Sequence, residues 1–279
     1  MPCQFDVVYE ACAAMAAESR DSTEVLAVDV ANTLRCAVER LVLENSALSV
    51  GVPAEGIFTK SIKIPAGLSE KQVEQITVVE AVSNLPVPPE EICADFLRNG
   101  AKADALTEEI DIAFCKRSLV DELGALAEDA GVSLWRLDRD TQGVHDAALL
   151  CIKEQLHQDE ARYPFGILLG GDVGRFVVCR GPLDHAVYAF SEGQSSDIDR
   201  VDLQVYCRRA GLMVENDAPL AQLLLVEDEG VINFAGNDAG VLAKEWARIA
   251  PRELMSGPSA TVPLYGLMVA TGMSLGSYA

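Results

Sequence analysis

The chain has 279 residues, of which 49% are hydrophobic, and it carries 43 acidic against 22 basic side chains, for a formal net charge of -21. This hydrophobic content supports buried cores, and at roughly 150 residues per domain the length predicts two domains. The negative charge repels phosphate backbones and anionic lipid headgroups, which argues against binding to nucleic acid and against direct binding to a membrane surface.

No targeting or membrane segment is visible in the sequence. The first residues lack a basic lead-in, and Asp6 and Glu10 interrupt what would have to be the apolar part of a secretory signal. A membrane-spanning helix needs about 20 apolar residues. The nearest candidate, 262–278, is interrupted by Pro263 and Gly272. We therefore expect a cytoplasmic protein that does not insert into a membrane by itself.

The eight cysteines are scattered, with no CxxC pair and no histidine cluster beside them. Zinc sites built on thiolates need such grouped ligands, so a metal site is not expected. Cys115 and Cys179 lie inside apolar runs, where a reduced thiol packs as a small hydrophobic group. Reduced thiols are typical of a cytosolic protein.

The N-terminal segment allows two interpretations. Residues 4–14 are compatible with a strand, and the apolar spacing within 30–43 predicts a helix with Asp29 as its N-cap. The alternative is that 28–33, VDVANT, forms an Asp-x-Gly type of phosphate-binding turn. Such a turn needs a glycine where the backbone approaches a phosphate, and none is present. The helix is therefore favoured.

Two strands and a helix start are predicted next. The strands lie at 48–52 and 58–64, and Pro65 ends the second because proline has no N–H to donate. Ser69 is a suitable N-cap for the following helix, and Gln72 stands three residues later, as in a capping box.

The helix at 70–82 must end before Pro86. Its apolar positions predict an inward face of Val73, Ile76, Val79 and Ala81 or Val82. The proline-rich segment 85–90, LPVPPE, is interpreted as a rigid connector. The alternative is that it forms one wall of a groove for a peptide.

The segment 109–150 repeats the order of strand, helix and strand. Alternating apolar residues predict a buried strand, and Gly131 ends the helix that follows. The buried strand positions are Ile110, Ile112 and Phe114, and the helix stripe is Leu119, Leu123, Leu126 and Ala127. Trp135, in the next strand at 132–137, belongs either to the core or to an interface, and the core is favoured. A further helix at 141–158 carries His145 and His157 as ordinary polar positions.

A hairpin is predicted in the run FGILLGGDVGRFVVC. Its turn contains Gly171, Asp172 and Gly174. Backbone amides of such a turn can hold a phosphate, and the aspartate can orient magnesium-bound water. Arg175 and Phe176 follow directly, and this bulky pair is expected to fill the loop. A plain hairpin turn is therefore an equal alternative.

Two stretches carry a longer pattern. Residues 49–96 are similar to the run "xVPxxxxxxKxIxLPxGLSExxxEQ" and the exit "PxPxEExxxDF", and residues 109–150 are similar to "AxxxxxVDxxxxLxExAGxxxxxxD". In these motifs the chain resembles the PilM family of type IV pilus assembly proteins. The end of the chain, GLMVATGMSLGSYA, is similar to the closing helix of that family. The resemblance is good over about half of the chain.

This resemblance implies an α/β protein with the actin-like (RNase H-like) ATPase fold. The first domain would span 1–160 and contain an inserted β-α-β-β-α-β subdomain at about 49–133, and the second would span 161–279. It also implies a cytoplasmic scaffold of the type IV pilus machinery. The scaffold would bind the cytoplasmic N-terminal tail of an inner-membrane partner of the PilN type, and it would communicate with pilus motor ATPases. The tail is expected in a groove between the inserted subdomain and the first domain.

By the same resemblance Gly171, Asp172 and Gly174 would be the nucleotide-binding residues, with ATP and magnesium as cofactors. No catalytic residue or metal ligand is predicted. Because bulky residues follow this turn and 234–237 is a poor substitute for the family's adenosine loop, we predict no ATPase activity. Two alternatives stay open: an active ATPase or kinase of this fold, and the cytoplasmic component of a type II secretion system. The second would normally continue into a membrane span.

Overall fold

The computed structural model describes residues 5–6, 47–53, 56–99, 106–158, 161–169, 175–189, 220–226, 243–250, 255–256, 268–269 and 273. These residues belong to two compact units. Unit 1 comprises residues 1–10 and 140–279, and unit 2 comprises residues 11–139. Each unit has buried apolar clusters of its own.

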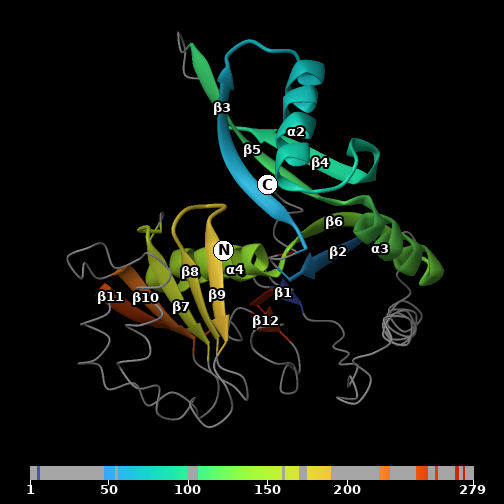
Figure 1. Cartoon of the computed structure of the whole chain (residues 1–279). Helices are drawn as coiled ribbons and strands as arrows, with labels where there is room; N and C mark the ends of the chain where they lie inside the picture. The colour runs from blue at the N-terminus through green and yellow to red at the C-terminus, as the bar shows by residue number, and fades with distance from the viewer. Residues whose placement is uncertain are drawn as a thin grey trace. The chain divides into compact units, whose positions relative to one another are not determined.

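Unit 2 contains a three-stranded antiparallel sheet with a helix against it (Figure 1). The strands β3 (Phe58–Pro65), β5 (Thr107–Lys116) and β4 (Ile92–Arg98) pair in the order β3-β5-β4. The helix α2 (Glu70–Asn84) follows β3, and a short 3-10 turn, η1 (Pro89–Glu91), leads into β4. The buried residues of this layer are Ile64, Val73, Ala81, Leu85, Ile92, Ile110, Ile112 and Phe114.

Two helix ends of unit 2 follow the predicted signals. The backbone N–H of Ser69 donates to Oε1 of Gln72 at 2.9 Å, as in a capping box. At the C-terminal end of α3 (Arg117–Asp129), the next helix, Gly131 has a φ of 80°. The N–H of Val132 then donates to the carbonyl of Ala127 at 3.0 Å, which closes the last turn of that helix.

The inward face of α2 differs in part from the prediction. Val73, Thr77 and Ala81 are buried, so the face follows a spacing of four residues. The prediction that Val79 points inward is wrong, because its side chain is 67% exposed. Val79 stands about half a turn from Thr77 around the helix, which places it on the side away from the sheet.

A second layer of unit 2 is a parallel strand pair with a helix beside it. β2 (Ala47–Val52) pairs with β6 (Ser133–Arg139), and α3 (Arg117–Asp129) connects β5 to β6. The order β3, α2, β4, β5, α3, β6 is the predicted β-α-β-β-α-β succession. Its last strand joins β2 and not the three-stranded sheet. The cluster beneath α3 contains Val52, Ile57, Cys115, Leu119, Leu123 and Leu137.

Trp135 lies in β6, at an irregularity of the pairing. The register passes from Leu134 opposite Leu48 to Arg136 opposite Ser49, so Trp135 is the extra residue. Its side chain is 70% exposed. The assignment of Trp135 to the core is therefore wrong. An extra residue in one strand disturbs the inward and outward alternation from which such an assignment is made.

Unit 1 contains a five-stranded mixed sheet in the order β11-β10-β7-β8-β9. Its strands are β7 (Phe165–Leu169), β8 (Arg175–Cys179), β9 (His185–Ala189), β10 (Leu220–Val226) and β11 (Ala243–Ile249). β7, β8 and β9 are antiparallel, as the predicted hairpin requires, and β10 is parallel to β7 and β11. All five residues of β7 are buried, which suits the central strand of a covered sheet.

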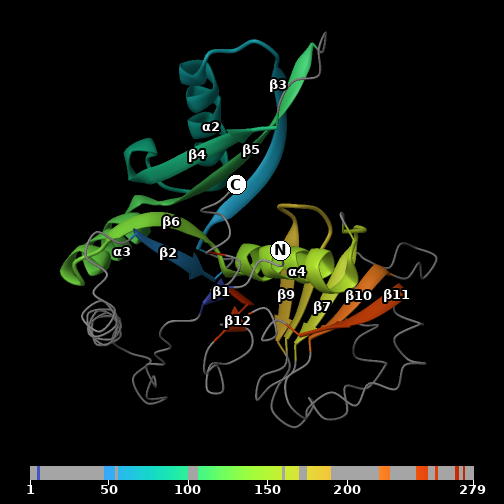
Figure 2. The same ribbon diagram turned by 180° about the vertical axis from the view of Figure 1, so that it is seen from behind.

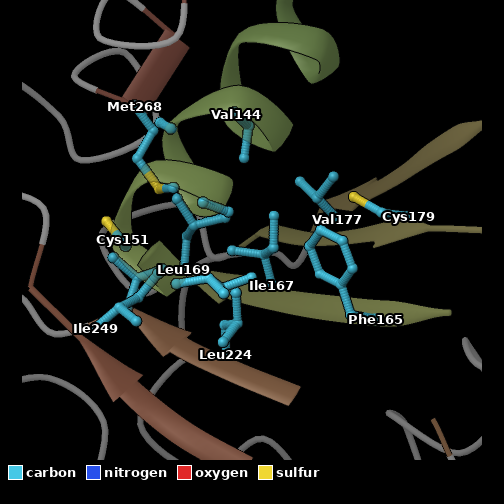
Figure 3. Packing of buried hydrophobic residues seen from close by; sticks show 14 residues of the cluster. Val144, Cys151, Phe165, Ile167, Leu169, Val177, Cys179, Leu224, Ile249 and Met268 are labelled. Carbon is cyan, nitrogen blue, oxygen red and sulfur yellow. The ribbon is translucent and has the colours of Figure 1, made fainter. Parts of the chain in front are cut away.

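The helix α4 (Asp140–Leu156) lies on one face of this sheet and crosses in front of the strands in Figure 2. Figure 3 shows the core between them, where Val144 and Cys151 of α4 approach Ile167 and Leu169 of β7. Near the end of the helix, the Gln155 amide binds both backbone groups of Ala250, at 2.8 and 2.9 Å. A short parallel pair, β1 (Phe5–Asp6) with β12 (Met255–Ser256), completes the strands described in unit 1.

The compact units part between Arg139 and Asp140, because α4 packs on the sheet of unit 1. The domain boundary predicted from the resemblance lies after residue 160 instead. Compactness alone does not define a domain. The predicted domains therefore stay a prediction: 1–160, with an insertion at 49–133, and 161–279. Beyond Phe5 and Asp6, the predicted strand at 4–14 and the helix at 30–43 lie outside the described residues.

Candidate functional site

Large apolar side chains are exposed on unit 2. Among the described residues, every large hydrophobic side chain identified as exposed belongs to this unit: Phe58, Val79, Val82, Leu97, Leu106 and Trp135. Large exposed apolar side chains can anchor a bound protein segment, and tryptophan is enriched among the residues that contribute most to protein interfaces. Unit 2 is therefore the described part of the chain that best fits a protein-binding surface.

The two faces of the three-stranded sheet differ in character. Ile112 and Phe114 belong to the cluster under α2, so the alternate residue Asp111 projects from the other face. There Ser61 Oγ donates to Asp111 Oδ1 at 2.6 Å, and the Asn99 amide donates to Asp111 Oδ2 at 2.9 Å. Leu97, which pairs with Asp111, shares this face and is 67% exposed. The face is thus a hydrogen-bonded polar surface that carries one apolar anchor.

In β6, a charged pair follows the exposed Trp135 in the sequence. The Arg136 guanidinium donates to the Asp138 carboxylate at 2.8 Å, and both side chains are partly exposed. Tryptophan combines a large apolar area with one N–H donor, and it is enriched among the residues that contribute most to protein interfaces.

The predicted nucleotide turn lies between β7 and β8. Gly171, Asp172 and Gly174 are outside the described residues, so their arrangement stays a prediction. The strands on either side are described, and Leu169 pairs with Arg175 next to the turn. Phe176 belongs to β8 and its side chain is 1% exposed. The expectation that Arg175 and Phe176 fill the loop stays a prediction, because residues 170–174 lie outside the described residues.

A cluster of polar and aromatic rings in unit 1 is the chemically richest group of described side chains. His145 Nε2 lies 2.7 Å from the Tyr163 hydroxyl, and His145 Nδ1 lies 3.0 Å from Asp146 Oδ1. The His145 ring stacks on that of His185, with centroids 4.6 Å apart, and on that of Phe165, with centroids 5.8 Å apart. His145 is 2% exposed, so its assignment as an ordinary polar position is wrong.

The periodicity of the helix is the signal that could have predicted the burial of His145. It stands in phase with Val144, Ala148 and Cys151, which form the buried face of α4. His157, by contrast, follows the last residue of α4 and is exposed, with a φ of 54°.

The surroundings of this cluster keep its phenol neutral. Burial, followed by the charges of Cys179 and Asp146, raises the pKa of Tyr163 to about 12. Elsewhere in the core of unit 1, burial raises the pKa of the Cys151 thiol to about 12. A neutral phenol is a poor nucleophile, and a thiol with a pKa this high reacts only slowly at neutral pH. The cluster therefore serves to join α4 to β7 and β9, and we assign it no reaction.

Two negative findings hold for the described ranges. No described helix is long and apolar enough to cross a membrane. Within the same ranges, no group of three or more His, Cys, Asp or Glu side chains could hold a metal ion.

The chain is similar to known proteins in its sequence and in its fold. The family model described as type IV pilus assembly protein PilM matches residues 5–179. Among solved structures, a PilM-PilN type IV pilus biogenesis complex matches with a TM-score of 0.56 and 16% identity, over 91% of this chain and 85% of that one. At this identity the match shows a shared fold.

Two weaker structural matches follow. The cytoplasmic domain of EpsL, an inner-membrane component of the type II secretion system of Vibrio cholerae, has a TM-score of 0.49 and 14% identity, over 89% of this chain and 82% of that one. A Bacteroides thetaiotaomicron protein with an actin-like ATPase fold and unknown function has a TM-score of 0.33 and 11% identity, over 78% and 75% of the two chains.

Proposed function

The chain belongs to the PilM family of type IV pilus assembly proteins, and from this membership we propose that it is a cytoplasmic scaffold that binds the N-terminal tail of an inner-membrane protein of the PilN type. The predicted actin-like fold is confirmed. A related structure of this fold is described as a PilM-PilN complex. The observation that carries the proposal is the complete β-α-β-β-α-β succession of unit 2, together with the apolar side chains exposed on that unit.

The physical basis of tail binding is the pairing of an extended peptide with a prepared surface. Main-chain hydrogen bonds supply much of the affinity, and a few apolar anchors supply the specificity. Trp135 and Leu97, which are 70% and 67% exposed, are candidate anchors. The net charge of -21 favours a tail that carries lysine or arginine, because complementary charge speeds association. Binding should then weaken as the ionic strength rises.

A direct binding assay tests this proposal. A fluorescent peptide with the sequence of the cytoplasmic tail of the PilN-type protein from the same pilus system is titrated with the full chain, and its anisotropy is measured. We expect saturable binding that a scrambled peptide of the same composition does not reproduce. Equal binding of the two peptides would mean that charge alone attracts them, and the proposal would be wrong.

The location of the protein follows from the same proposal. With its partner it would be held at the inner membrane, whereas its own negative charge opposes contact with anionic lipid. A scaffold held in this way would also meet the motor ATPases of the pilus machine, and we include that contact in the proposal.

We further propose that this chain does not work as an ATPase. An active ATPase or kinase of this fold would need two phosphate-binding turns and an adenosine loop, and the sequence offers one altered turn, at Asp172 to Gly174. Isothermal titration calorimetry with ATP and magnesium should therefore detect weak binding or none, and phosphate release should match the buffer. Micromolar affinity that is abolished by Asp172→Ala would instead favour the enzyme.

A further inference from the structure

Two cysteines of unit 2 face each other across neighbouring strands. Cys93 in β4 and Cys115 in β5 are direct partners in the antiparallel register, and both thiols are free. Residues in this relation project from the same face of a sheet. Cys115 is buried and Cys93 is partly buried, so a reagent from solution reaches Cys93 first.

The spacing of an antiparallel pair suits a disulfide. The Cα atoms of opposite residues lie about 4.5–5.5 Å apart, and a disulfide joins Cα atoms roughly 4.4–6.8 Å apart. A second sign of proximity is electrostatic: after burial, the charge of Cys93 is the next cause that raises the pKa of Cys115, to about 11. The two sulfur atoms therefore need little backbone movement to meet.

The pair lies in the small core beneath α3. Both cysteines pack with Ala113, Leu119 and Leu123. Next to them, Arg117 at the start of α3 donates hydrogen bonds to the carbonyls of Glu90 and Ile92, at 2.9 and 3.0 Å. The start of β4 is thus already attached to the β5-α3 corner by hydrogen bonds, at the point where a disulfide would add a covalent attachment.

We propose that Cys93 and Cys115 are a redox pair, which a small-molecule disulfide such as oxidised glutathione converts reversibly into a cross-strand disulfide between β4 and β5. In the first step the Cys93 thiolate attacks one sulfur of oxidised glutathione. A mixed disulfide forms, and one glutathione thiolate leaves. In the second step the Cys115 thiolate attacks the Cys93 sulfur and releases the second glutathione thiolate. The two cysteine thiols are oxidised, one glutathione disulfide is reduced, and the two thiol protons pass through solvent to the released thiolates.

The bond should be easy to reverse. Opposite Cβ atoms in a sheet are about 4.5–5.5 Å apart, whereas a disulfide holds them at about 3.8 Å. Closing the bond draws the strands together, and a strained disulfide is reduced more readily than a relaxed one. We therefore expect Cys93 and Cys115 to be reduced thiols in a reducing compartment and to form the disulfide only under oxidising conditions.

Peptide mapping of the full chain tests the proposal. The native protein is incubated with oxidised glutathione, remaining thiols are alkylated, and trypsin is added without reductant. Cleavage after Lys71, Arg98, Lys102 and Lys116 yields the peptides 72–98 and 103–116, each with one cysteine. We expect these peptides to be joined, to separate on reduction, and to join faster as the pH rises toward the pKa of Cys115, near 11.

Controls and a structural readout complete the test. Cys93→Ser should abolish the joined peptides, whereas Cys151→Ala, which removes a buried thiol of unit 1, should leave them unchanged. Amide exchange in 92–98 should slow roughly tenfold on oxidation, because the bond opposes local opening of the edge strand β4. Glutathione retained on Cys93 without any link to Cys115, or a link that forms only in denaturant, would overturn the proposal.

Discussion

Replacing Gly143 with alanine should destabilise unit 1, because the added methyl group would meet backbone atoms. A Cβ atom at this position of α4 would lie 2.7 Å from the carbonyl oxygen and 3.0 Å from the Cα of Val269. Both are backbone atoms, so no side chain can turn away to make room. Overpacking of this kind costs about 1–3 kcal/mol. Urea denaturation followed by circular dichroism should show a lower midpoint with a similar slope.

Gly124→Ala is the matched control for this change. Gly124 lies within α3, and a Cβ atom there would meet nothing within 4 Å. Alanine is favoured over glycine in a helix by up to about 1 kcal/mol, so this variant should be as stable as the parent or more stable. If the two variants lose stability equally, the close approach of α4 to Val269 is not the cause.

Replacing Trp135 with alanine should lower the affinity for the partner tail by roughly thirtyfold, which corresponds to the 2 kcal/mol typical of an aromatic residue at the centre of an interface. The same change should alter the free energy of unfolding by less than about 0.5 kcal/mol, because the side chain is 70% exposed in the free protein. Anisotropy with the labelled tail peptide measures the first quantity, and urea denaturation measures the second.

Val79→Ala is the control for the binding effect. Val79 is 67% exposed, but it lies on the side of α2 that faces away from the sheet. We expect its replacement to leave the affinity for the tail unchanged. If both variants bind like the parent, Trp135 is not an anchor, and if both bind weakly, the tail occupies a different surface.

Local signals in the sequence predicted the elements of unit 2 well. Ser69 and Gln72 mark the start of α2, and Gly131 follows the end of α3, because caps depend on neighbouring backbone groups alone. The alternation of β5 likewise predicted that Ile110 and Phe114 are buried. Each of these features is decided within a few residues, so a single sequence contains the necessary information.

Burial that depends on distant packing was predicted less well. α2 carries apolar residues on two sides, and sequence alone does not say that Val73 is covered and Val79 is not. The register irregularity in β6 moves Trp135 into solvent, and it depends on the pairing with β2. His145 is buried because Tyr163, Phe165 and His185 approach it from other elements. None of these partners is adjacent to it in the chain.

For the candidate sites, too, local motifs were informative, whereas features that depend on distant loops stay predictions. The resemblance identified the family from the motifs in residues 49–96 and 109–150, and the family is confirmed. Nucleotide binding at Asp172 depends on the backbone of a turn and on contacts from other loops, which residue types alone do not determine. It stays a prediction, as does the groove for the partner tail.

Hydrogen exchange of the full chain with and without the tail peptide is the most direct test of the scaffold proposal. Main-chain pairing protects backbone amides, so we predict slower exchange within 47–53, 56–99 and 106–139 of unit 2 and little change in the described strands of unit 1. Asp172→Ala should leave this pattern intact if scaffolding is independent of nucleotide. Protection confined to unit 1, or no protection at a saturating peptide concentration, would contradict the proposal.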